Sequence, residues 1–245
     1  MIIDAHTHLG VSEVSGLEIT EEQLLSSMDN NKVDISLVIP LSMMKEAEKG
    51  HTQIVSLCTK YPQRFKGIAD INPLLSKERY FKEAQKWIQK ADFIALKFHP
   101  LLYPLSPLDE KAEKVFQTAR KLEIPVIIHT GIGIPNALPS LCIPVAKKYK
   151  EVKIVLAHAG SPFYTREAYV VAWECENVYL ETSWCQIYDL KFILKRLGTQ
   201  KIMMGSDLPD NLPLELTKYH LIGLKGEKLE QCFYRTATEV FRLNK

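Results

Sequence analysis

The chain has little of what would indicate a nucleic-acid partner or a membrane. Its 31 Lys and Arg residues nearly balance its 29 Asp and Glu residues, which gives a net charge of +2 with the two signs interspersed. A nucleic-acid-binding protein would carry a basic stripe or block, and the sequence has none. The longest nearly apolar run, DISLVIPLSMM, is too short to span a bilayer and contains Pro40. We therefore expect neither a nucleic-acid partner nor a membrane association.

Cysteine is scarce and is not spaced for a disulfide framework or a cysteine zinc site. The five cysteines are scattered along the chain, and no two of them are separated by exactly two residues. We expect them to be buried, reduced side chains, and only Cys185, which follows a predicted strand, is considered as a nucleophile. The first residues lack the basic and long apolar regions of a signal peptide, so we expect a cytoplasmic protein.

Short apolar runs alternate with longer stretches of helical spacing. The predicted strands are residues 1–6, 34–40, 65–72, 93–99, 125–130, 153–159, 177–183 and 201–207. Most lack polar alternation, which is typical of parallel strands that are covered on both faces. Between them, residues 109–123 have the pattern of an amphipathic helix, with Ala112, Val115, Phe116 and Ala119 on one side.

Eight strand–helix repeats in 245 residues predict one (β/α)8 TIM barrel, of the α/β class. An open doubly wound sheet is the alternative, but it usually carries a glycine-rich phosphate-binding turn, and no such motif is present. No linker or change in composition divides the chain. We expect a single domain over residues 1–245.

Histidines gather at the predicted strand ends. Five of the seven lie there: His6, His8, His99, His129 and His158. The carboxyl ends of barrel strands meet at one mouth, where the chemistry of such enzymes takes place. His6 and His8 are two residues apart, so they share one face of a strand and can point inward together.

This pattern favours a metal site. His6 and His8 offer two imidazole nitrogens, and His129 and the carboxylate of Asp207 complete a mixed set suited to zinc or a similar divalent ion. The alternative for any single histidine is a hydrogen-bonded core residue. Burying several imidazoles together without a metal or a polar network would be costly, which favours the metal interpretation.

The motifs at the strand ends resemble those of the amidohydrolase superfamily, in particular its amidohydrolase-related family 2. The stretches DAHTHLG, ALKFHP, VIIHTG, VLAHAG, NVYLETS and MMGSDLP occur in the family's order over residues 1–209. The resemblance implies a metal-dependent hydrolase on a distorted (β/α)8 barrel. It implies that His6, His8, His129 and Asp207 bind one divalent ion, with Zn²⁺ preferred over Mn²⁺, Fe²⁺, Co²⁺ or Ni²⁺. It further implies that Asp207 takes a proton from the attacking water and that His158 polarises the substrate or acts as an acid or base.

Lys97 and His99 allow two interpretations. In other branches of the superfamily a carboxylated lysine and the strand-six histidine bind a second metal, so Lys97 is either such a ligand or a buried ammonium that pairs with Asp70, Glu181 or Asp207. We favour the one-metal interpretation, in which His99 supports a ligand or contacts the substrate.

The resemblance leaves the reaction open. It implies cleavage of an amide, ester or lactone of a small molecule, but the same branch includes non-oxidative decarboxylases of aromatic or unsaturated carboxylic acids, hydratases and metal-independent lactonases. A barrel that binds metal without turnover is a further alternative.

The loops 9–19, 41–51, 99–109 and 161–167 are short, which favours a small substrate. Arg166 is a candidate for holding a substrate carboxylate and Trp184 for stacking on a ring, although a surface role for each is the alternative. A homo-oligomer is compatible with the sequence but is not predicted by it.

Overall fold

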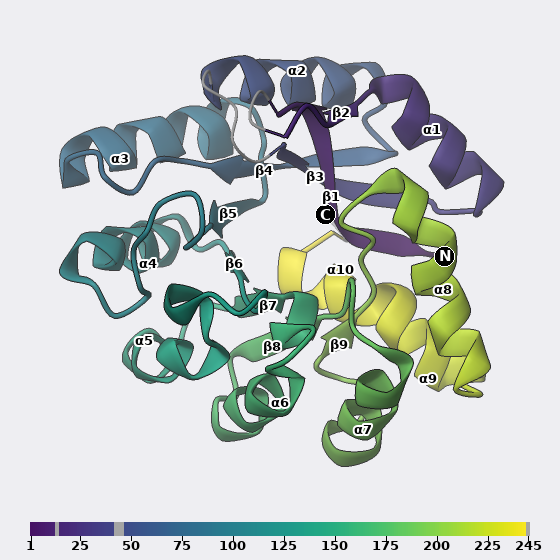
Figure 1. Cartoon of the computed structure of the whole chain (residues 1–245). Helices are drawn as coiled ribbons and strands as arrows, with labels where there is room; N and C mark the ends of the chain where they lie inside the picture. The colour runs from purple at the N-terminus through teal and green to yellow at the C-terminus, as the bar shows by residue number, and fades with distance from the viewer. Residues whose placement is uncertain (13–14, 42–46, 244–245) are drawn as a thin grey trace.

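Eight parallel strands surround a central axis, and helices cover the ring on the outside (Figure 1). The computed structural model describes residues 1–12, 15–41 and 47–243. The parallel strands are β1 (Ile3–Val11), β3 (Ile35–Pro40), β4 (Phe65–Asp70), β5 (Ala95–Phe98), β6 (Val126–His129), β7 (Ile154–Ala157), β8 (Val178–Glu181) and β9 (Ile202–Met203). Each pairs with its neighbour in chain order, as the predicted strands require.

The ring closes through few bonds between its first and last strands. Beyond β9, the backbone of Met204 accepts a hydrogen bond from Ala5, and the amide of Asp207 donates one to His6 over 2.7 Å. One isolated bridge joins Thr7 to Asp207. The prediction of a distorted (β/α)8 barrel in a single α/β domain is confirmed.

The helices follow the strands in turn, as the predicted strand–helix repeats require. They are α1 (Glu21–Asn30), α2 (Ala47–Lys60), α3 (Lys77–Gln85), α4 (Glu110–Leu122), α5 (Cys142–Lys148), α6 (Thr165–Glu174), α7 (Ile187–Leu197) and α8 (Leu212–Leu221). The four apolar residues predicted for one side of α4 are all buried. Most of these helices pack buried side chains against the outer face of the sheet and form the larger of two apolar cores. Among the described helices, none is both long and apolar enough to cross a membrane.

A smaller apolar core fills the amino-terminal end of the barrel. It consists of inward side chains such as Ile3, Leu37, Ile127 and Met203, against which the last helix packs. After α9 (Gly226–Glu230), the chain passes through a π-helical turn into α10 (Thr236–Phe241), which Figure 1 shows at the centre of the ring. This core closes one end of the barrel, and the polar side chains lie at the other.

Strand β1 contains an irregularity that decides how its histidines point. Asp4 and Thr7 pair with Ser36 and Val38 of β3, so β1 advances three residues while β3 advances two. The extra residue is a β-bulge, which shifts the alternation of inward and outward side chains. Ala5 belongs to the barrel interior below the bulge, and His6 and His8 face the interior above it. The sequence did not predict this bulge, nor the short strand β2 (Glu18–Ile19), which pairs antiparallel with the end of β1.

Candidate metal centre

All of the predicted site residues except Arg166 lie at the carboxyl end of the barrel, in or beneath the lining of one cavity of about 640 Å³. The described residues that line it are His8, Ser12, Ser15, Leu17, Leu41, His99, Leu101, His129, Ile132, His158, Ser161, Pro162, Trp184, Asp207 and Leu208. His6 and Lys97 lie beneath this lining and are fully buried. Residues 13–14 and 42–46 of the predicted substrate loops lie outside the described residues.

Three of the four predicted ligands converge on one point. The Nε2 atom of His6 lies 3.4 Å from Oδ1 of Asp207, and the Nε2 atom of His8 lies 3.2 Å from the same oxygen. These three atoms all lie within 4.8 Å of one another. Asp207 has a positive φ of 65°, an uncommon conformation for a residue with a side chain. A strained backbone at this position is consistent with a functional site.

The opposite ring nitrogens fix which atoms of His6 and His8 are free. Nδ1 of His6 donates to Oε2 of Glu181 over 2.8 Å, and Nδ1 of His8 donates to the carbonyl oxygen of Pro40 over 3.2 Å. In the neutral imidazoles, both Nε2 atoms therefore carry lone pairs. Metal-binding histidines usually donate their other N–H to a carboxylate or a carbonyl in this way.

The arrangement fits a divalent cation. The Oδ1 atom of Asp207 lies 3.2–3.4 Å from two imidazole nitrogens that carry lone pairs, so a cation between these three acceptors would offset their mutual repulsion. Imidazole nitrogen and carboxylate oxygen are the donor types that zinc and similar ions bind. We conclude that His6, His8 and Asp207 can hold such an ion.

The ammonium group of Lys97 also lies beside the candidate metal centre. Its Nζ lies 3.1 Å from Nε2 of His6. Burial lowers the pKa of Lys97, and the carboxylates of Asp207, Asp70 and Glu181 oppose that shift. One of the two interpretations of Lys97 was an ammonium paired with one of these three carboxylates, but its hydrogen-bond partner among the described residues is His6. Carboxylation of Lys97 stays a prediction.

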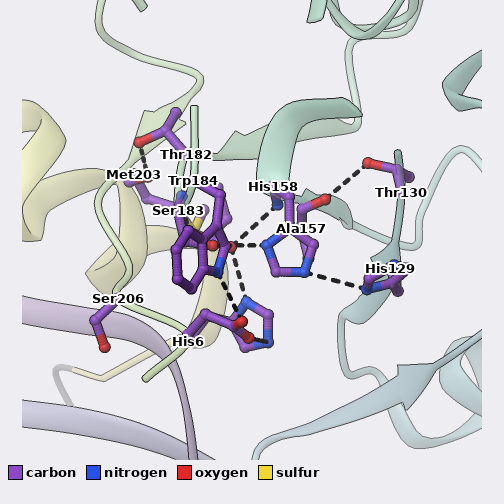
Figure 2. A network of polar contacts seen from close by, with 12 residues as sticks. His6, His129, Thr130, Ala157, His158, Thr182, Ser183, Trp184, Met203 and Ser206 are labelled. Atoms are coloured by element: carbon purple, nitrogen blue, oxygen red, sulfur yellow. Dashed lines mark hydrogen bonds and ion pairs between the residues drawn. The ribbon is translucent and has the colours of Figure 1, made fainter. Parts of the chain in front are cut away.

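His129 and His158 form a second pair of rings beside His6 (Figure 2). Nε2 of His158 and Nδ1 of His129 are 3.1 Å apart, while Nδ1 of His158 lies 2.8 Å from the hydroxyl of Ser183. Nε2 of His129 is buried and has no hydrogen-bond partner among the described residues. His129 is thus not one of the three convergent ligands, and its role as a fourth stays a prediction. The ring of His99 stacks on that of His129, with centroids 4.2 Å apart.

Charge states at the centre follow from burial and from neighbouring groups. Burial lowers the pKa of His158 to about 4, so its imidazole is neutral at pH 7. Burial alone would raise the pKa of Asp207, but its interactions with the His158, His8 and His6 rings hold it well below its usual range. Asp207 is therefore an ionised carboxylate that can bind a cation or accept a proton.

Two contacts were not anticipated from the sequence. The indole Nε1 of Trp184 donates to Oδ2 of Asp207 over 2.8 Å, so the tryptophan predicted to contact substrate also holds the aspartate. Glu181, considered only as a partner of Lys97, instead binds His6 and Ser183. Its position at the end of a strand, in the motif NVYLETS, matches that of the histidines and is the signal that could have identified it.

Two other residues singled out in the sequence, Arg166 and Cys185, do not take part in the candidate metal centre. The guanidinium of Arg166 lies 4.2 Å from the centre of the Phe192 ring and is not among the described residues that line the cavity. Its role in substrate binding stays a prediction. Cys185 is buried, and burial raises the pKa of its thiol to about 12, which argues against a nucleophile.

Comparisons with known proteins bear on the fold and the family. The chain resembles the 5-carboxyvanillate decarboxylase of Sphingomonas paucimobilis, with a TM-score of 0.79, 14% identity and 98% of each chain covered. A 5-carboxyvanillate decarboxylase of Novosphingobium aromaticivorans, complexed with manganese and 4-hydroxy-3-methoxy-5-nitrobenzoic acid, gives 0.79 and 14%, with 99% of this chain and 96% of that chain covered. The 4-oxalomesaconate hydratase of Rhodopseudomonas palustris gives 0.74 and 17%, covering 100% of this chain and 97% of that chain.

At these identities the three structures show a common fold. No curated protein sequence matched the chain significantly. The family model described as amidohydrolase matches residues 40–243, which is most of the chain. On this match, the protein belongs to the amidohydrolase family.

Proposed function

We propose that the protein is a metal-dependent hydrolase that cleaves an amide, ester or lactone bond of a small molecule. The observation that carries the proposal is the convergence of His6 Nε2, His8 Nε2 and Asp207 Oδ1 beside a cavity. His129, whose buried Nε2 lacks a partner among the described residues, is proposed as the fourth ligand. Zn²⁺ is the proposed ion, and the manganese in a structural relative supports Mn²⁺ as an alternative.

Each residue then has a chemical task. When bound, a divalent ion lowers the pKa of its water from 15.7 to about 7. The ionised carboxylate of Asp207 would accept a proton while Trp184 holds its Oδ2 atom. His158, neutral at pH 7 and exposed to the cavity, would exchange a proton with the substrate or polarise its carbonyl group.

The cavity supports an uncharged, largely apolar substrate. Its apolar lining residues are Leu17, Leu41, Leu101, Ile132, Pro162, Trp184 and Leu208. Among the described lining residues there is no Arg or Lys that could pair with a substrate carboxylate. A neutral ester, lactone or amide suits such a surface, because burying an unpaired charge in it would be costly.

Decarboxylation is the second candidate. Two of the structural relatives are decarboxylases of an aromatic acid, and a divalent ion could itself hold a carboxylate. A barrel that binds metal without turnover is a third.

A substrate panel separates these candidates. The zinc- or manganese-loaded protein would be incubated with small esters, lactones, amides and aromatic carboxylic acids, and both hydrolysis products and released CO₂ would be measured. We expect metal-dependent hydrolysis without CO₂. Release of CO₂ from an acid would overturn the hydrolase proposal in favour of decarboxylation, and a metal-loaded protein that converts no compound of the panel would favour a binding role.

A cytoplasmic location of the protein stays a prediction.

A further inference from the structure

A buried carboxylate that the proposed reaction does not use lies behind the metal centre. Glu181 is completely buried, and its two oxygens accept from four donors. Oε2 contacts Nδ1 of His6 at 2.8 Å, the hydroxyl of Ser183 at 2.9 Å and the amide of His158 at 3.2 Å, while Oε1 contacts the amide of Ser183 at 2.5 Å. Two of these donors are backbone amides, which can only donate, and their hydrogen bonds favour the ionised form of Glu181.

An ionised carboxylate can only accept hydrogen bonds. This fixes which group donates in each hydrogen bond of the series from Glu181 through Ser183 and His158 to His129. The single hydroxyl hydrogen of Ser183 must point to Glu181, so Oγ of Ser183 can only accept from Nδ1–H of His158. With its hydrogen on Nδ1, His158 has a lone pair on Nε2. That lone pair accepts from Nδ1–H of His129, 3.1 Å away.

The end of this chain of bonds is the unpartnered nitrogen of His129. With its hydrogen on Nδ1, the ring leaves a lone pair on Nε2, the buried atom without a partner among the described residues. If Ser183 instead donated to His158, both later bonds would reverse and Nε2 of His129 would carry a hydrogen. Oγ of Ser183 and Oε2 of Glu181 would then face each other as two acceptors at 2.9 Å.

We propose that Glu181 is the positioning residue that sets the proton positions of His6, His158 and His129, in the last two cases through Ser183. One carboxylate thereby presents lone pairs on Nε2 of both His6 and His129, the two histidine ligands proposed on β1 and β6. The catalytic consequences rest on the proposed function, whereas the proton order does not.

One independent contact agrees with this order, and another shows the space that Glu181 needs. The ammonium of Lys97 can only donate, and it lies 3.1 Å from Nε2 of His6, so that nitrogen accepts. Gly205 leaves the space that Glu181 occupies, because a Cβ atom at residue 205 would lie 2.6 Å from Oε1 of Glu181.

These hydrogen positions also distinguish between the two roles considered for His158. Its Nε2 atom is an acceptor, so His158 can take up a proton but cannot donate a hydrogen bond from Nε2 until it has done so. The structure thus favours an acid or base role for His158 over polarisation of a substrate carbonyl by its neutral ring.

Nitrogen NMR of the histidine rings tests the proposal directly. In zinc-loaded protein labelled with ¹⁵N-histidine, two-bond ¹H–¹⁵N spectra distinguish the protonated ring nitrogen from the unprotonated one. We expect hydrogen on Nδ1 of His6, His129 and His158. A hydrogen on Nε2 of His158 in the unmodified protein would overturn the proposal, whatever the activity.

The variant Ser183→Ala interrupts the series of hydrogen bonds from Glu181 to His129 without changing a proposed metal ligand. We expect His158 and His129 to move their hydrogens to Nε2 together, because the bond between the two rings then reverses, while His6, still bound to Glu181, keeps its hydrogen on Nδ1. Ser36→Ala, which removes another buried serine hydroxyl that takes no part in these hydrogen bonds, is the matched control and should leave the hydrogens of His6, His129 and His158 in place. Unchanged rings in Ser183→Ala would contradict the role of Ser183.

Metal binding and turnover separate this proposal from the proposed function. Glu181→Gln should weaken zinc binding about 10–100-fold, the usual effect of removing a partner of a metal ligand, and Ser183→Ala should lower kcat to a similar extent. An unmodified protein that lacks turnover but shows the expected proton positions would contradict only the proposed function. Full zinc affinity in Glu181→Gln would contradict the positioning role.

Discussion

Asp207 gives its two carboxylate oxygens different tasks. Oδ1 faces the Nε2 atoms of His6 and His8, and Oδ2 accepts the indole N–H of Trp184. The indole thereby fixes the rotation of the carboxylate and leaves one oxygen directed at the centre. This geometry explains how one residue can bind an ion and still be held in position for proton transfer.

The carboxylate of Asp207 is the first test of the proposed chemistry. Asp207→Asn should lower turnover by at least about 100-fold, because an amide cannot accept the proton of the attacking water. Metal content and kcat should be measured together, since some metal could remain on the histidines. Asp210→Asn, an exposed aspartate three residues away, is the matched control and should keep full activity. Normal turnover in Asp207→Asn would exclude Asp207 as the proton acceptor.

The two histidines of the second pair should differ in what they lose. His129→Ala should lose most of its metal and its activity, because His129 is proposed to bind the ion. His158→Asn should retain metal and lose about 100-fold or more in turnover, the usual scale for a general acid or base. Metal content and turnover of both variants should be compared. Loss of metal in His158→Asn to the same extent as in His129→Ala would make His158 a ligand, as its closeness to His6 allows.

At the scale of the elements, the strands were predictable because their apolar runs are local. Seven of the eight observed parallel strands lie within the predicted ranges, and β1 extends beyond its predicted range to Val11. The amphipathic pattern of 109–123 likewise predicts α4 to within one residue at each end. The bulge in β1 and the place of α10 were not predictable, because both depend on residues far along the chain packing together.

In the candidate site, too, the features encoded by local sequence patterns were predictable, and the contacts between distant residues were not. The histidines could be located because barrel strands end at one mouth, so their sequence positions imply their meeting. The link from Glu181 to His6 joins residues 175 positions apart, across the interior of the closed barrel. No local pattern encodes that link, or the indole of Trp184 that holds Asp207.

The last helix makes a prediction at this scale. Phe241 on α10 is buried in the core that closes the barrel, so Phe241→Ala should lower the free energy of unfolding by about 3–5 kcal/mol. Phe163→Ala, at a residue that is 76% exposed, should change it by less than about 0.5 kcal/mol. Denaturant titration measures both. Equal stability of the two variants would show that α10 does not support the barrel.

For the whole molecule, the candidate metal centre lies on the closing seam of the barrel. His6 and His8 come from β1 and Asp207 follows β9, and few backbone bonds join these segments. An ion bound by all three would therefore connect the first and last strands. A ligand that binds only the folded state also stabilises it by mass action.

Chelation should accordingly lower the melting temperature. Free metal at 100 times its Kd contributes about 2.7 kcal/mol. Each kcal/mol corresponds to about 2–4 °C for a protein of this size, so removal should lower Tm by about 5–10 °C. Added zinc or manganese should restore it. An unchanged melting curve after verified removal of the metal would contradict a site that joins these strands.

The central claim is that His6, His8 and Asp207, with His129, form a centre for one metal ion on which catalysis depends. Elemental analysis of protein purified without chelator, combined with turnover before and after metal removal, tests it most directly. We predict close to one equivalent of divalent metal per chain and loss of activity when the metal is removed. Full activity of metal-free protein would contradict the claim. Two equivalents, with the additional mass of a carboxylate on Lys97, would contradict the single-ion centre.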